Sequence, residues 1–360
     1  MRTFYWYFRP IAVASKISGV FPIENVTSLD TSRLQFRAFS WSSLYTFLVF
    51  CFYSCTFYYF TDFIFYVPPS KIYISYVTGF IAGRSVISFM FCYGRLRKLP
   101  KLIRLLDTFD QRKSKYLTIP KICTKNKLRM IIFPVLLVSL CSFFTTFLSS
   151  QLVKKILPPD VVDNVKGTIA CCFFSFLSSW QIYPSFLFIY FAVRITQNLH
   201  EINISMQQQN LMQDYFNDTT KFEPEMHQTL ANIRLLHNML SDCVHELGKC
   251  YGSFLAVDHL CIIAVFVLNI SVFIYESNHD PHLLLLTVGN GIILMNTISV
   301  SHELKKSGSE IINLLHGIPS MVIPGQMQQE INIFFTQLMV RPIQISAGGY
   351  FILDKSYTLS

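Results

Sequence analysis

Apolar residues along this chain gather in six long stretches. Four of the stretches hold no charged residue and two hold a single one; they are residues 38–61, 130–153, 167–193 and 281–302, with 72–94 around Arg84 and 252–275 around Asp258. A helix needs roughly 20 apolar residues to cross a hydrocarbon core of about 30 Å. The pattern therefore predicts an all-α fold, a polytopic membrane helical bundle with six spans.

The polar segments between the later spans have a helical period. Residues 194–250 predict two arms that continue the fourth and fifth spans and are joined by a turn at 217–225. On the second arm an apolar stripe recurs every three or four residues: Leu230, Ile233, Leu236, Leu240 and Val244. Residues 303–316 extend the sixth span, and 326–339 form another amphipathic segment. These helices are expected to pack into a stalk outside the membrane.

Basic residues lie almost entirely on alternate sides of the spans. Segments on one side, including residues 1–37 and 95–129, carry 25 Lys and Arg residues against 4 on the other side. Cytoplasmic loops carry such an excess, so the N-terminus is predicted to be cytoplasmic. The formal net charge of +9 comes from these inner segments, and their expected partners are membrane lipids and not nucleic acid.

This orientation divides the chain into three expected regions. Residues 1–37 form a cytoplasmic N-terminus. Residues 38–302 form the six-span bundle, including the cytoplasmic arms 95–129 and 194–250. Residues 303–360 form a stalk segment. The ten cysteines all fall in spans or on the inner side, so no outer disulfide framework is expected.

Residues 341–356, with the sequence RPIQISAGGYFILDKS, carry a family resemblance. The segment resembles the one that precedes the last helix of insect gustatory receptors, which are related to insect odorant receptors. The matching features are a small-residue pair before two aromatic residues, then Leu353-Asp354 and Ser356. Upstream, Phe335 and Gln337 are similar to residues that are usual in this family. The predicted topology agrees with the resemblance.

The resemblance implies a seven-span, tetrameric, ligand-gated cation channel at the plasma membrane, homomeric or shared with other receptor subunits. Its last helix lines the pore, and a pocket among spans 2 to 6 takes a small-molecule tastant. Residue 360 falls just before the expected pore helix and its closing Thr-Tyr…Gln-Phe signature. As written, the chain is not expected to conduct ions by itself. A truncated, non-conducting or assembly-only subunit is the alternative function.

Polar and aromatic residues inside the spans are the candidate ligand contacts. A charge at the centre of a span costs about 2.5–3.5 kcal/mol and usually faces the bundle interior. Arg84 is therefore a candidate for binding ligand or for pairing with Asp258. The other candidates are amides and aromatic side chains in later spans: Asn269, Asn290, Phe174 and Trp180. Gly289 and Gly291 beside Asn290 are expected to allow close helix packing.

Four residues are predicted to act in gating or in the stalk. Asp258 lies about two turns into the fifth span, and Gln337 lies on the last amphipathic segment. Gly348 and Gly349 are expected to form a hinge or a close-packing point where the chain turns toward the missing helix. Arg84, Phe174, Trp180, Asn269 and Asn290 thus form the expected ligand site, separate from these four.

Other functions fit the sequence poorly. Two segments begin like the metal-binding helices of zinc proteases, HELGK at 245–249 and HELKK at 302–306. Each has Lys at the position where the second His ligand belongs, so neither forms a metal site. We therefore expect no enzymatic activity, no bound metal and no cofactor. The charge pattern and the cysteine positions disfavour a G-protein-coupled receptor. No internal repeat supports a secondary transporter. A gustatory receptor is favoured, with bitter plant compounds as the preferred ligand class.

Overall fold

The computed structural model describes residues 3–17, 21–51, 97–117, 165–208, 223–275, 281–317 and 325–354, together with 83, 84, 86, 90, 93 and 94. Side chains are described from 183 onward in the fourth span. The expected span 130–153, the later part of 38–61 from residue 52 onward, and most of 72–94 lie outside the described residues. Within the described part the chain is mostly helical, as the sequence predicts.

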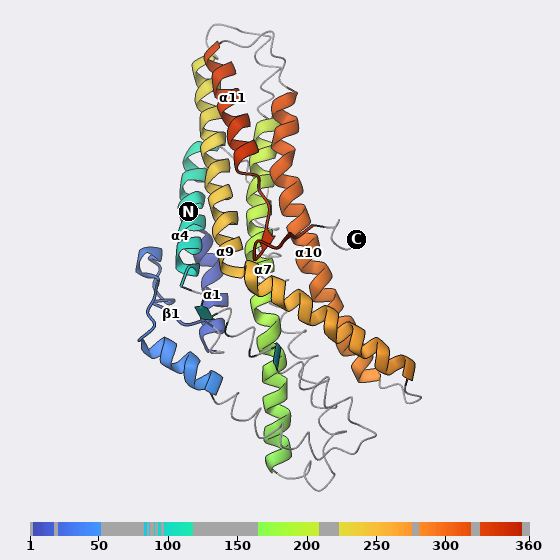
Figure 1. Cartoon of the computed structure of the whole chain (residues 1–360). Coiled ribbons are helices and arrows are strands. Elements are labelled where there is room, and N and C mark those ends of the chain that lie inside the picture. The colour runs from blue at the N-terminus through green and yellow to red at the C-terminus, as the bar shows by residue number, and fades with distance from the viewer. Residues whose placement is uncertain are drawn as a thin grey trace.

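Long helices run side by side at one end of the molecule and separate at the other (Figure 1). The long helices are α7 (Val165–Gln208), α9 (Glu223–Tyr275) and α10 (Pro281–His316). Two shorter helices pack against the bundled end, α4 (Leu99–Tyr116) and α11 (Gly325–Val340). The first half of α9 lies in this bundled end, which we call the stalk. The C-terminal part of α9 and the N-terminal part of α10 run together away from α7 (Figure 1).

The two halves of α9 bury their apolar residues differently. In the stalk half, the stripe that the sequence predicts is buried: Leu230, Ile233, Leu236, Leu240 and Val244. In the outer half, apolar side chains are exposed on several sides; Leu260 is 60% exposed and Ile274 is 70% exposed. Such exposure is unusual in water but suits contact with lipid. Among the described residues, the helix over His227–Ser271 is the one long and apolar enough to cross a membrane.

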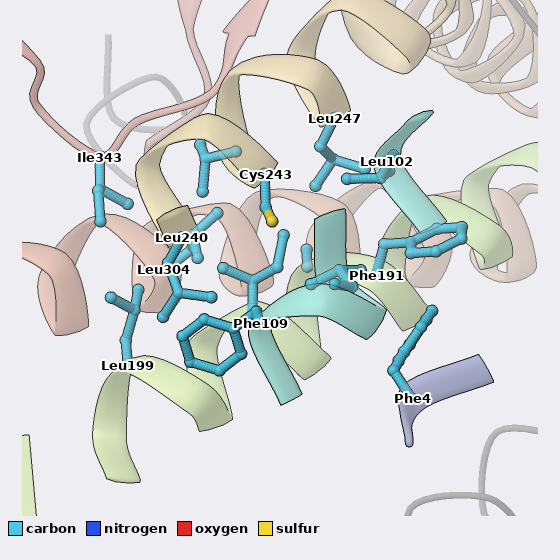
Figure 2. Packing of buried hydrophobic residues seen from close by; sticks show 14 of the residues in the cluster. Phe4, Leu102, Phe109, Phe191, Leu199, Leu240, Cys243, Leu247, Leu304 and Ile343 are labelled. Carbon is cyan, nitrogen blue, oxygen red and sulfur yellow. The ribbon is translucent and has the colours of Figure 1, made fainter. Parts of the chain in front are cut away.

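The stalk core joins side chains from every one of its helices. In Figure 2, Leu102 and Phe109 of α4, Phe191 and Leu199 of α7, and Leu240 of α9 surround the buried Cys243. Burying a large apolar side chain contributes about 1.5–3 kcal/mol, so this cluster is a main source of stalk stability.

Buried ion pairs fix α4 against α7. Lys113 Nζ lies 2.5 Å from Glu201 and donates to Asn198 at 2.9 Å, while Arg194 contacts Asp110 at 3.0 Å. Burial lowers the pKa of Lys113, and the Glu201 carboxylate opposes that shift. Removing one partner of a buried ion pair leaves an uncompensated buried charge, so it lowers the free energy of unfolding far more than the loss of a surface pair does. The pairs therefore fix how α4 sits on α7.

A helix not predicted from the sequence, α1 (Phe4–Ile17), docks on this stalk. Phe8 packs against Phe191 of α7 with tilted rings whose centroids are 5.0 Å apart, and the Phe4 ring centroid lies 5.8 Å from that of Phe191. The Asp107 carboxylate of α4 accepts from the Tyr5 amide at 3.3 Å. A negative charge is favourable at a helix N-terminus, where backbone N–H groups lack helical partners.

Two minimal hairpins interrupt the all-α pattern. Strand β1 (Ile23–Glu24) pairs antiparallel with β2 (Gln35–Phe36), around the short 3-10 helix η1 (Thr31–Arg33). Strand β3 (Ser346–Ala347) pairs antiparallel with β4 (Phe351–Ile352). Each strand has two residues, so the fold class remains helical. Residues 41–51 form an apolar helix between the first hairpin and the bundle.

The Tyr5 hydroxyl offers a test of how firmly α1 is docked. Tyr5 is buried and donates to the Val26 carbonyl at 2.6 Å. Tyr5→Phe leaves that acceptor without its donor, so we expect a loss of about 1–2 kcal/mol in stability. Thermal unfolding of the purified protein measures the loss. Tyr7→Phe, on a less buried side of α1, is the matched control and should change the midpoint much less.

Candidate functional site

A buried ion pair lies in the part of the molecule where the long helices separate. Arg84 donates from Nε to Asp258 Oδ1 at 2.7 Å, and Nη2 lies 2.7 Å from the same oxygen. The side chains of Arg84 and Asp258 are only 2% and 1% exposed. The pairing that the sequence suggests is thus confirmed. It offsets the cost that either charge alone imposes inside an apolar environment.

Two further residues complete this polar cluster. Asn290 of α10 accepts from Arg84 Nη1 at 2.7 Å, and Ser185 of α7 donates to Asp258 Oδ2 at 3.2 Å. The cluster, defined as Arg84, Ser185, Asp258 and Asn290, therefore joins α7, α9 and α10 through one guanidinium and one carboxylate. It is polar but has no net charge.

The glycines beside Asn290 face open space within the described part of the chain. A Cβ placed on Gly289 or Gly291 meets no atom of the described residues within 4 Å. The expected close packing at these glycines therefore stays a prediction. Asn290 itself accepts a hydrogen bond from Arg84.

Asn269 lies about one helical turn from the cluster. Its amide Nδ2 donates to Thr287 of α10, three residues before Asn290, while its Oδ1 is buried with no hydrogen-bond partner in the described structure. On α9 it is eleven residues beyond Asp258, about 16 Å along the helix axis. The structure thus places two of the predicted ligand contacts, Asn269 and Asn290, at neighbouring turns of the α9–α10 pair. Phe174 and Trp180 belong to α7, but their side chains lie outside the described residues.

Two polar positions near the cluster were not predicted. Ser185 follows Pro184 inside α7, and its only sequence signal is a small polar residue in an apolar span. His259, next to Asp258, contacts Thr297 of α10 through Nε2 at 3.0 Å. The sequence signal for His259 was its position next to Asp258, the single charged residue of its apolar stretch. Both contacts tie the same helices together as the cluster does.

The predicted gating residues of the C-terminal part do not join the cluster. Gly348 and Gly349 have φ angles of 65° and 90° and form the turn between β3 and β4. A Cβ on Gly348 would lie 3.5 Å from Ser253 of α9, whereas one on Gly349 would meet nothing within 4 Å. The pair is therefore a tight turn, and only Gly348 lies near α9.

Gln337 lies on α11, at the edge of a shallow groove of about 650 Å³. Its Nε2 is buried and has no hydrogen-bond partner in the described structure. Uncharged polar side chains of α11 form much of the groove wall, among them Gln329, Asn332 and Thr336. The groove is in the stalk, so it is separate from the ligand residues predicted in the spans.

The sequence from residue 8 to residue 360 matches the family model of the 7tm chemosensory receptors. The chain belongs to this family. The receptor is accordingly a multi-pass membrane protein. No curated protein matches the receptor significantly.

Solved insect olfactory receptors share the receptor's fold. Olfactory receptor OR5 from Machilis hrabei aligns with a TM-score of 0.71 and 16% identity, covering 98% of this chain and 93% of that one. The same receptor in complex with eugenol aligns with a TM-score of 0.67 and 14% identity, with the same coverage. The structural similarity confirms the predicted fold class, and the family-model match confirms the predicted chemosensory receptor family.

Proposed function

We propose that this receptor is a gustatory, ligand-gated cation channel subunit that senses small tastants, with bitter plant compounds favoured. Membership of the chemosensory receptor family supports a receptor role. The resemblance of residues 341–356 to gustatory receptors supports taste over smell. The observation that carries the ligand site is the Arg84 cluster, because it places buried polar groups from separate helices inside the apolar bundle.

The charge balance of the cluster suggests the chemistry of the ligand. Arg84 and Asp258 neutralise each other, so an ionic ligand would bring an unpaired charge into a site of low dielectric. An uncharged molecule with an aromatic body and one or two hydroxyl groups fits better, since it can exchange hydrogen bonds with Asn290 while its ring contacts apolar walls. The M. hrabei receptor was solved with eugenol, and we propose ligands of comparable size.

The same proposal includes topology and assembly. The receptor lies in the plasma membrane with its N-terminus in the cytoplasm, which the charge pattern supports. Its stalk comprises the arms 95–129 and 194–250 and the segment from 303 onward. Subunits assemble as homo- or hetero-tetramers. A tag at the N-terminus that antibodies reach on intact cells would contradict this orientation.

The proposed function is tested by separating binding from conduction. The purified chain in lipid nanodiscs is titrated with eugenol and with a panel of uncharged aromatic plant compounds, and calcium entry is recorded in cells that express it. Saturable binding with ligand-dependent calcium entry supports the proposal. Binding without calcium entry favours the non-conducting or assembly-only alternative. If none of these compounds binds saturably, the proposed ligand site is contradicted.

Asn290→Ala tests the role of the cluster in binding. The change removes the amide that accepts from Arg84 and that we propose also meets the ligand. Loss of such a hydrogen-bonded group should weaken binding by about tenfold without lowering the amount of receptor at the surface. Ile292→Ala, two residues away and 57% exposed, is the matched control. Equal dose-response curves for Asn290→Ala and the control would count against the site.

A further inference from the structure

The chain after α11 forms an extended segment, residues 341–354, which we call the strap. It leaves the end of α11, runs along α9 and reaches α10 (Figure 1). Along its first part alternate side chains are buried, Ile343, Ile345 and Ala347, while the residues between them are less covered. This two-residue period is that of an extended chain with one face packed on a core.

Two glycines allow the strap to touch both helices directly. A Cβ on Gly252 of α9 would lie 2.5 Å from the Ser346 carbonyl oxygen, and a Cβ on Gly308 of α10 would lie 2.6 Å from Ile343 Cβ. No side chain fits at either distance. The strap therefore meets the backbone of α9 through its own backbone and the backbone of α10 through the Ile343 side chain, and it cannot keep both contacts if these helices move apart.

Polar contacts fasten the two ends of the strap to different helices. At its start, Arg341 contacts Asp242 of α9 at 2.8 Å. At its end, Asp354 is bound twice on α10, since its carboxylate oxygens lie 2.5 Å from His302 Nδ1 and 2.5 Å from Lys305 Nζ. A relative shift of α9 and α10 must thus strain one end of the strap or release it.

The same two helices carry the polar cluster. Asp258 is six residues beyond Gly252 on α9, about 9 Å along the axis, and Asn290 is twelve residues before His302 on α10, about 18 Å along the axis. Each of the two helices is continuous between the cluster and the strap contacts, and α9 changes direction between its stalk half and its outer half (Figure 1). A rearrangement of α9 relative to α10 at the cluster therefore has an unbroken helical path to the strap contacts on both helices.

We propose that Asp354 is a positioning residue that couples the membrane cluster to the strap, so that ligand occupancy changes how firmly the strap is held between α9 and α10. The proposal rests on the proposed ligand-gated function. It adds the residues through which the ligand site acts on the chain that follows α11. Asp354 acts through His302 and Lys305 and does not touch the ligand.

Hydrogen exchange of the intact receptor in nanodiscs tests the attachment. Asp354→Asn removes the charge that joins the strap to α10, so exchange over residues 342–353 should rise by about fivefold. Glu303→Gln removes an exposed negative charge from the same turn of α10 and is the matched control. Lys305→Met is a second variant, 42% exposed and unable to disturb the core, that should raise exchange in the same segment. Exchange equal to the control in both variants overturns the proposal.

A second experiment tests the coupling without any ligand. Asn290→Ala perturbs the cluster and should raise strap exchange by about fivefold, whereas Ile292→Ala on the lipid-exposed side should not. Equal exchange in these two variants overturns the coupling. Neither experiment uses a ligand. If the receptor fails to bind eugenol or related compounds, the proposed function is contradicted, but the exchange results still test the coupling. If eugenol binds wild type, its effect on strap exchange should be lost in Asp354→Asn.

Discussion

Asp258→Asn is expected to be the most damaging single substitution in the membrane part of the receptor, lowering stability by about 3–5 kcal/mol. The change removes the charge that neutralises Arg84, which is buried with it. Arg84 then keeps a full positive charge in a medium that solvates it poorly. The expected result is a much lower yield of folded protein and a lower unfolding midpoint in detergent.

Two comparisons distinguish loss of the charge pair from loss of a hydrogen bond. Ser185→Ala removes only a neutral donor to Asp258 and should cost about 1 kcal/mol. The double change of Arg84→Met with Asp258→Leu removes both charges and should recover much of the stability that Asp258→Asn loses, because no charge is left unpaired. A double variant as unstable as Asp258→Asn would show that the pair is needed for more than mutual neutralisation.

The stalk is expected to lose stability when the pH around it falls, and His237 is the cause. Its ring packs on Phe334 of α11 with centroids 5.6 Å apart. Burial, opposed in part by the Gly308 backbone, lowers the pKa of His237 from 6.5 to about 4. Above pH 6.5 the ring is neutral in folded and unfolded chains alike. As the pH falls from 6.5 toward 4, the unfolded chain binds a proton that the folded one does not, so stability falls by about 3 kcal/mol.

This pH dependence is measured as the unfolding midpoint of the purified receptor between pH 7.5 and pH 4.5. His237→Leu places an apolar side chain of similar volume between α9 and α11 in place of the titrating ring. The variant should therefore lose less stability on acidification than wild type does. His200→Leu changes an exposed histidine of α7 in the same stalk and serves as the control. Identical acid destabilisation of wild type and His237→Leu would contradict the role of His237.

Features set by local periodicity or by the membrane were predictable from the sequence. The stripe from Leu230 to Val244 follows from helical geometry, and it is buried as expected. The Arg84–Asp258 pair was also predictable, although 174 residues separate its members, because two lone opposite charges in apolar spans have few other ways to be satisfied. His237 lies on the same stripe, so its burial also had a signal in the sequence.

Features that depend on contacts between distant segments were not predictable. Helix α1 contains Pro10 and Lys16, which break its apolar pattern, and part of its aromatic face packs on α7, which is far away in the sequence. The strap lies between α9 and α10 because of Gly252 and Gly308, and neither glycine is marked out in the sequence. The hydrogen bond between Arg84 and Asn290 likewise joins segments that are distant in the sequence.

The docking of α1 on α7 has a consequence for biosynthesis. Phe4 and Phe8 leave the ribosome first, but their partners Tyr190 and Phe191 are made more than 180 residues later. At 5–20 residues per second, this interval is on the order of ten seconds or more. During that time the nascent aromatic residues are exposed to the cytosol and to chaperones. A chain that ends before residue 190 would therefore leave Phe4 and Phe8 without the aromatic partners that cover them in the full structure.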